Sequence, residues 1–266
     1  MSRLPLGRKV NQPVRRDPSV LCAIQRKPCP IPVHGYDLWR SYELSWLDEK
    51  GKPEAGILDL AYPVQSGFIV ESKSLKLYLG GLSYERFSSR EELRQVIGQD
   101  LGSILKTGWL SINVADLVSP QDAPSWKELG GTCLDTQDIT IDTYTRTPDL
   151  LSCGQGQTEE ALTSNLLKTS CPITGQPDWA TVEVRYRGRV IDHASLLRYI
   201  CSYRDHRGFA EEVSELIYVD LMERCSLDTL RVTCFYTRRG GIDITAHRRS
   251  EDRKSTRLNS SHVSQS

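Results

Sequence analysis

The sequence predicts an α+β protein built on antiparallel sheet. Runs in which apolar and polar residues alternate are joined by short turns, as in hairpins. Helical segments come in pairs between these runs rather than after every strand, which disfavours an alternating parallel sheet. The order of strands and helices then partly recurs in the second half of the chain. A Rossmann cofactor site is not supported, because no G-x-G-x-x-G sequence follows a predicted strand.

The first half begins with an arm, residues 1–30, that is rich in Pro, Arg and Lys and is expected to be irregular. Alternation predicts strands over residues 39–47, 55–62, 66–70 and 109–117, and a further strand at Ile139, Ile141 and Tyr144. Helices are predicted over residues 74–82 and from about Ser88. Two overlapping pairs, Ser88 with Glu91 and Ser89 with Glu92, fit a capping box at the start of the second helix.

The second half follows a segment rich in Gly, Gln, Ser and Thr at residues 147–160, which predicts a domain boundary. We therefore divide the chain into a domain of residues 31–150 and a domain of residues 151–249. Asp192 is a candidate N-cap and Gly188 a candidate turn. Strands are predicted over residues 182–186, 230–236 and 242–244, and helices over residues 192–203 and 209–225.

Composition restricts the class of function. The 34 basic residues equal the 34 acidic ones, whereas a protein that binds nucleic acid directly shows a basic excess or stripe. No run approaches the roughly 18 apolar residues of a membrane span. Eight cysteines occur without a C-x-x-C pair, and the five histidines are scattered. We therefore expect reduced thiols, a cytoplasmic location, and no metal site, nucleic-acid partner or membrane partner.

The tail over residues 250–266 is interpreted separately. Its run from Asp252 to His262 resembles the translation of a DNA-sequencing adapter. We predict that this tail is non-native and disordered, since it is dominated by Ser and Arg.

Cys171 is the cysteine with the most promising surroundings. It enters a loop that holds Pro172 and Pro177, and an acid follows at Asp178. Such a loop can fold back and place the carboxyl group beside the thiol, where it can move a proton. A buried cysteine beside an exposed aspartate explains the same spacing and is the simpler interpretation.

Two further groups lie where predicted helices begin. The run from Val70 through Glu71, Ser72 and Lys73 joins a strand to a helix, and helix N-termini favour anions. Glu211 lies in the first turn of a later helix. Ordinary capping and dipole complementarity explain each of these features when it is taken alone.

Together these segments resemble the long form of the 7-cyano-7-deazaguanine reductase family. The resemblance covers about residues 30–249, in order, and is most specific in residues 71–78, in the C-x-I-T-x-Q-P-D-W run from Cys171 and in residues 236–244. Residues 34–39 and 131–142 also resemble that family.

The resemblance implies two tandem tunnelling-fold domains, the fold of GTP cyclohydrolase I, with antiparallel sheets and helices on one face. It implies a homodimer that uses NADPH and no metal, and reduces the nitrile of 7-cyano-7-deazaguanine to an amine in tRNA queuosine biosynthesis. By the same resemblance Cys171 is the nucleophile that forms a thioimide, and Asp178 is the proton donor. The implied base-binding residues are Val70, Glu71, Ser72 and Glu211, and the implied NADPH-binding residues are Ser72, Lys73, Arg239 and Gly240.

One departure keeps other functions open. The family has histidine where this chain has Ala210, and cysteine where it has Val213. His206 is a substitute only if its loop allows it. A reductase that has lost catalysis but still binds the base is therefore an alternative. A pterin-type cyclohydrolase, which needs zinc ligands, and a cysteine hydrolase of nitriles or amides are two others.

Overall fold

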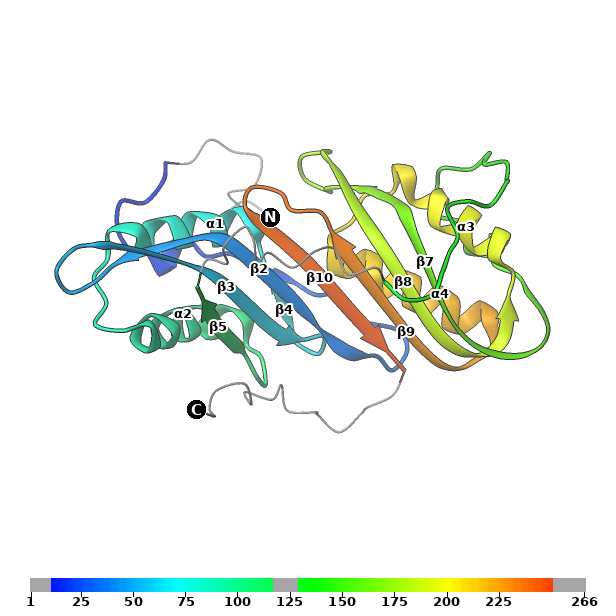
Figure 1. Ribbon diagram of the computed structural model, residues 1–266, viewed down its shortest axis with the longest axis horizontal. Helices are drawn as coiled ribbons and strands as arrows, with labels where there is room; N and C mark the ends of the chain where they lie inside the picture. Colours follow the sequence, from blue (N-terminus) through cyan, green and yellow to red (C-terminus); the bar gives the residue numbers. More distant parts are fainter. Residues whose placement is uncertain (1–10, 117–128, 251–266) are drawn as a thin grey trace.

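One sheet of eight strands forms the centre of the molecule. A computed structural model describes residues 11–116 and 129–250. The strand order is β5-β3-β2-β10-β9-β8-β7-β6 (Figure 1). Neighbouring strands pair antiparallel, apart from β6 and β7, which pair parallel. The strands are β2 (His34–Leu47), β3 (Pro53–Pro63), β5 (Ser111–Ala115), β6 (Thr132–Cys133), β7 (Cys153–Ser170), β8 (Pro177–Ile191), β9 (Leu227–Tyr236) and β10 (Ile242–Arg249).

In the described residues, four helices cover the sheet in two pairs, which confirms the α+β class. They are α1 (Ser72–Gly81), α2 (Arg90–Leu105), α3 (His193–Cys201) and α4 (Ala210–Cys225). A small sheet pairs β1 (Ala23–Gln25) with β4 (Phe68–Val70), and 3-10 turns occur at Pro18–Val20, Leu82–Tyr84, Pro148–Leu150 and Ser202–Asp205. Burial alternates along β2, where Asp37, Trp39 and Ser41 are buried between half-exposed neighbours. One face of the sheet is therefore covered, as period-two alternation requires.

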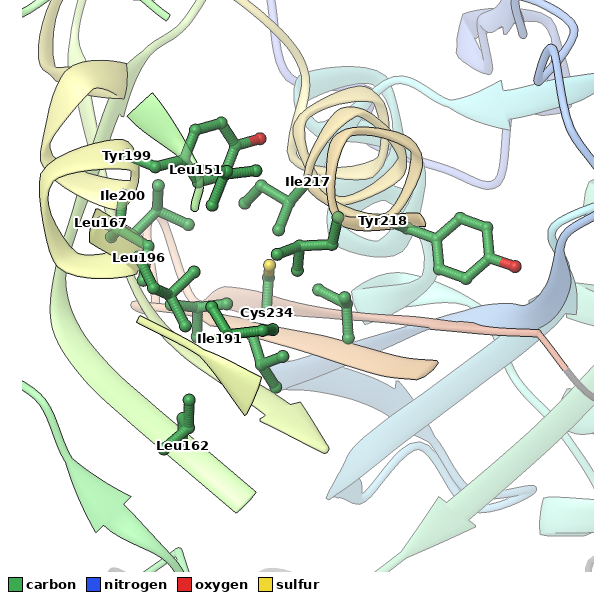
Figure 2. Packing of buried hydrophobic residues seen from close by; sticks show 14 of the residues in the cluster. Leu151, Leu162, Leu167, Ile191, Leu196, Tyr199, Ile200, Ile217, Tyr218 and Cys234 are labelled. Carbon is green, nitrogen blue, oxygen red and sulfur yellow. The ribbon is translucent and has the colours of Figure 1, made fainter. Parts of the chain in front are cut away.

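The buried apolar residues form two cores. One joins α1 and α2 to β2 and β3, and the other joins α3 and α4 to β7, β8 and β9. Figure 2 shows the second core, where Leu196 and Ile217 point from the helices toward Cys234 on the sheet. Ile244 of β10 packs against both cores. The junction between the two halves is therefore a strand that both halves share.

Predicted helix starts agree with the structure. Ser89 caps α2 by accepting a hydrogen bond from the Glu92 backbone N–H, and Asp192 caps α3 through the Ser195 N–H. The Glu92 side chain accepts instead from Ser88. None of the helices in the described parts of the chain is long and apolar enough to cross a membrane.

Two local predictions are wrong. Ile139 to Tyr144 form no strand; Ile139 instead packs against the second core from an irregular segment. Gly188 lies inside β8, where the register shifts, rather than at a turn. Its φ of +152° and the 2.7 Å between an added Cβ and the Cα of Leu227 explain why glycine stands at this irregularity.

The predicted domain limits stay predictions. Strand β7 starts inside the segment that was expected to separate the domains, and Leu134, assigned to the first domain, packs in the second core. The arm over residues 1–30 contains β1 and one 3-10 turn in its described part. The predicted tail falls outside the described residues from residue 251 onward.

Candidate active site

A pocket between the starts of α1 and α4 gathers most of the predicted site. It is lined by residues from α1, the β7–β8 hairpin, the first turn of α4 and the β9–β10 turn. Seven predicted residues line it: Val70, Glu71, Ser72, Cys171, Asp178, Glu211 and Arg239. Lys73 and Gly240 lie in the sequence beside lining residues but do not line the pocket themselves. The structure therefore brings together groups that are up to 169 residues apart, counting from Val70 to Arg239.

Cys171 lies where β7 ends and the hairpin turn begins. Its N–H donates to the Gln176 carbonyl at 2.8 Å, and the Gly175 N–H donates to the Cys171 carbonyl at 2.9 Å, which fixes the turn. Burial acts to raise the pKa of the thiol. Hydrogen bonds from the Thr174 hydroxyl, nearby backbone N–H groups and Arg239 outweigh it, so that the pKa lies below its ordinary value. The environment therefore favours the nucleophilic thiolate.

Asp178 lies on the opposite side of the same hairpin. It pairs with Thr169 in the strand register, two residues before Cys171. Burial raises the pKa of the carboxyl group, and an ion pair with Arg239 at 3.1 Å opposes the rise without cancelling it. The two groups are thus shifted in opposite directions, as a nucleophile and a proton donor require.

Glu71 forms one wall of the pocket and is fully buried at the N-terminus of α1. Its two carboxylate oxygens accept hydrogen bonds from the backbone N–H groups of Lys73 and Ser74, each at 2.8 Å. Val70 ends β4 and Ser72 begins α1, so both are placed by the strand-to-helix junction. This wall is rigid because the helix start itself holds the carboxylate.

Glu211 forms the opposing wall, in the first turn of α4. The side chain is buried, and its Oε1 atom has no hydrogen-bond partner in the structure. Burial, followed by the charge of Asp37, raises the pKa of this carboxyl group to about 8. The two acidic walls are therefore not equivalent, since one is satisfied by protein groups and the other is open to a ligand.

Ala210 adds only a methyl group to the wall where the resemblance implies an imidazole. It lines the pocket, whereas His206 does not. The His206 ring packs edge-on against Tyr203, with 5.3 Å between ring centroids. Burial lowers the pKa of His206, so its imidazole is neutral near pH 7. No histidine of the described residues therefore replaces the missing side chain in the pocket.

Of the residues implied for NADPH, Ser72 and Arg239 line the pocket, and Lys73 and Gly240 follow them in the sequence. Arg239 and Gly240 form the β9–β10 turn, in which Gly240 has a φ of +59°. Lys76 of α1 holds this turn by donating to the Gly240 carbonyl at 2.7 Å, and also pairs with Glu43 at 2.9 Å. Basic side chains and an accessible backbone suit a phosphate-bearing ligand.

Aromatic residues of the pocket were not selected from the sequence. Trp39, Phe209 and Tyr236 line it, and the buried Tyr236 hydroxyl has no hydrogen-bond partner in the structure. Their position in the sequence could have identified two of them, because Phe209 stands two residues before Glu211 and Tyr236 begins the Y-T-R-R-G-G run. These rings supply the apolar surface that a planar base requires.

In the described parts of the chain, no group of three or more His, Cys, Asp or Glu residues could hold a metal ion.

Comparisons with known proteins show the family to which the chain belongs. Residues 8–113 match the family described as the N-terminal part of nitrile reductase, 7-cyano-7-deazaguanine reductase, and residues 177–255 match the family described as QueF-like protein. A Bordetella pertussis protein is 42% identical over 259 residues, with 93% of each chain covered. A Desulfotalea psychrophila protein is 40% identical over 262 residues, with 92% of each covered. A Coxiella burnetii protein is 44% identical over 219 residues, with 82% of this chain and 78% of the relative covered. All three relatives are named NADPH-dependent 7-cyano-7-deazaguanine reductase.

Proposed function

Because this chain belongs to the 7-cyano-7-deazaguanine reductase family, we propose that it reduces the nitrile of 7-cyano-7-deazaguanine to the amine of 7-aminomethyl-7-deazaguanine, with NADPH, in queuosine biosynthesis. The observation that supports this most directly is the pairing of Cys171 with Asp178. A thiol with a lowered pKa and a carboxyl group with a raised pKa line the same pocket. Nucleophilic addition to a nitrile needs both.

The Cys171 thiolate adds to the nitrile carbon and forms a C–S bond. One C–N π bond breaks, and the nitrogen takes a proton from Asp178, which gives a thioimide. Covalent addition replaces one hard step by two easier ones. Two NADPH molecules, bound one after the other, would each supply one hydride, the first to the thioimide and the second to the imine that follows. When the C–S bond breaks, the hydrogen bonds from Thr174 and Arg239 stabilise the departing thiolate.

The base would lie between the two acidic walls. A deazaguanine presents ring N–H and amino donors, and carboxylates are acceptors when ionised. Glu211 has a free acceptor atom directed to no protein donor. Val70 and Ser72 would shape the end of the pocket beside Glu71. For NADPH, Ser72, Lys73, Arg239 and Gly240 fit a phosphate-bearing ligand because they combine positive charge with a turn that α1 holds in place.

The tandem tunnelling fold, the homodimer and the cytoplasmic location belong to the same proposal. The division of the structure into two helix-covered halves supports the repeated fold. Two exposed apolar side chains on the hairpin that carries Cys171, namely Ile173 and Trp179 at 43% and 42% exposure, support a second copy near the pocket. Light scattering of the purified chain measures the number of copies.

The function is tested by mixing the protein with 7-cyano-7-deazaguanine and NADPH, and following nicotinamide absorbance to its endpoint. We expect two NADPH oxidised per nitrile. Loss of nitrile without NADPH oxidation would instead indicate a cysteine hydrolase. Binding of the base without any reaction would indicate the alternative that Ala210 keeps open, a binding protein that has lost catalysis.

Replacing Ala210 with histidine is expected to raise turnover. A pocket imidazole can share proton transfer to the substrate nitrogen, and one such group typically contributes a factor of roughly 10² or more, of which about tenfold is expected where Asp178 already acts. The measurement is kcat from NADPH oxidation. Ala55→His, on an exposed position of β3, is the matched control and should change nothing. An unchanged kcat in Ala210→His would show that another group already moves this proton.

A further inference from the structure

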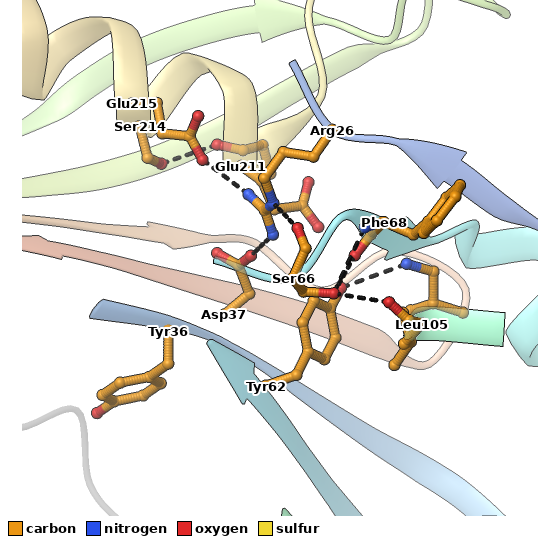
Figure 3. Close-up of polar contacts among 12 residues, drawn as sticks. Arg26, Tyr36, Asp37, Tyr62, Ser66, Phe68, Leu105, Glu211, Ser214 and Glu215 are labelled. Atoms are coloured by element: carbon orange, nitrogen blue, oxygen red, sulfur yellow. Dashed lines mark hydrogen bonds and ion pairs between the residues drawn. The ribbon is translucent and has the colours of Figure 1, made fainter. Parts of the chain in front are cut away.

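A network of four buried charges lies behind the Glu211 wall, formed by Arg26, Asp37, Glu215 and Arg248. Arg26 contacts Asp37 at 2.5 Å and Glu215 at 2.7 Å. Arg248, which is 0% exposed, contacts Asp37 at 2.7 Å and Glu215 at 3.2 Å. Figure 3 shows Arg26 reaching between Asp37 on β2 and Glu215 on α4. Two cations and two anions cancel, so that the network is neutral by itself.

The hydrogen bond that joins Glu211 to this network is made by its backbone. The Arg248 Nη2 atom donates to the Glu211 carbonyl at 3.2 Å, while the Glu211 Oε1 atom has no partner. Both guanidinium groups are already engaged with Asp37 and Glu215. Their charges favour ionised Glu211, but Asp37 and Glu215 already match them and burial outweighs them, so that ionised Glu211 would add a net negative charge to a buried site.

The other titratable groups around Glu211 bring no further cation to its carboxyl group. Those on the elements packed against it are Arg26, Asp37, Tyr62, Glu71, Tyr236 and Arg248. Asp37 and Glu71 are acids and the two tyrosines are neutral phenols. Across the pocket, Arg239 is engaged with Asp178, and the Cys171 environment favours a further anion.

We propose that Glu211 carries a proton in the ligand-free protein and releases it when a base with adjacent ring N–H and amino donors enters the pocket, so that substrate binding is coupled to the release of one proton. This inference rests on the proposed function, since it requires a guanine-like base at this wall. The donors of the base supply a hydrogen bond to Oε1, the carboxyl oxygen that accepts none from the protein. Asp37 acts as a positioning residue, because its charge helps to keep the free carboxyl group neutral.

The proton on Glu211 determines how the affinity for the base changes with pH. The pKa of Glu211 is raised from 4.5 to about 8 in the free protein, and hydrogen bonding to the ionised form lowers it in the complex. Between the two values, binding removes a proton, and the base binds more tightly as the pH rises. We expect Kd to fall by up to about tenfold per pH unit in that window, and to level off above about pH 8.

Calorimetric titration with 7-cyano-7-deazaguanine at pH 7, in buffers of different ionisation enthalpy, tests this. The protein is Cys171→Ala, so that no adduct forms. We expect close to one proton released per site, and less than about a tenth of that number at pH 9. In Cys171→Ala with Glu211→Gln the release should disappear. Binding with no proton release at pH 7 would overturn this inference and leave the proposed function intact, whereas absence of binding would overturn the proposed base site itself.

A second variant tests the network. Asp37→Asn should lower the proton release at pH 7 and shift the pH dependence of Kd to lower pH, because it removes the charge that acts most strongly on Glu211. Asp220→Asn is the control, since Asp220 is a buried acid of α4 that pairs with Arg146 instead. Equal proton release in both variants would remove Asp37 from the proposal. If Asp37→Asn does not fold, the pH series of the Cys171→Ala protein decides by itself.

Discussion

Replacing Cys171 with alanine is expected to lower kcat by at least about 10³-fold, the scale seen when a covalent nucleophile is removed. The hairpin should survive, because it is fixed by backbone bonds from Gln176 and Gly175 rather than by the sulfur. The base should still bind, since both acidic walls remain. The measurements are NADPH oxidation for turnover and intact-protein mass for the covalent adduct.

The control for this variant is Cys133→Ser, which changes an exposed cysteine of β6. It should keep both turnover and adduct formation. Residual turnover in Cys171→Ala within tenfold of the parent protein would mean that hydride reaches the nitrile without prior addition of sulfur.

Asp178→Asn is expected to have the second largest effect, a fall in kcat of roughly 10²-fold to 10³-fold, because an amide keeps the shape but cannot supply a proton. The pH profile adds a separate test. Burial raises the pKa of Asp178, so its protonated form persists to higher pH than an ordinary aspartate. The activity that depends on this proton is present below that pKa and is lost as the pH rises through it.

The fall in kcat at high pH that deprotonation of Asp178 causes should therefore be missing from the pH profile of Asp178→Asn. Asp149→Asn is the control, because Asp149 is an exposed acid paired with Arg224 at 2.7 Å, outside the pocket. A profile of unchanged shape in Asp178→Asn would assign the proton to another donor, and the buried hydroxyl of Tyr236 would be the next to test.

The sequence predicted the elements whose signals are local. Helices α2 and α3 were placed within a few residues because Ser89 and Asp192 are caps at their starts. Strand β7 was not predicted, and its first half lies in the segment that was interpreted as a domain boundary, where most residues are exposed or half-exposed. Without a buried face there is no alternation of apolar and polar residues to detect.

The candidate site likewise has one part that local sequence signals predict and one part that they do not. Cys171 and Asp178 are seven positions apart, on one hairpin, so their proximity was predictable from the turn. The network around Arg26 and Arg248 was not predictable, because its members come from β2, β10, α4 and the segment after β1. Burial of so many charges is visible only once the strand order is known.

Strand β10, the last strand of the described residues, lies between β2, the first strand of the large sheet, and β9, the strand just before it in the sequence. On a ribosome, Cys171 therefore emerges well before Arg239, which helps to lower its pKa, and before Arg248, which anchors the first turn of α4. A nascent chain that stops short of β10 leaves the inner edges of β2 and β9 unpaired, and such edges recruit other chains. The hydrogen bond from Arg239 is thus added only after synthesis has passed β9, whereas the hydrogen bonds from Thr174 and Ile173 are available as soon as the β7–β8 hairpin forms.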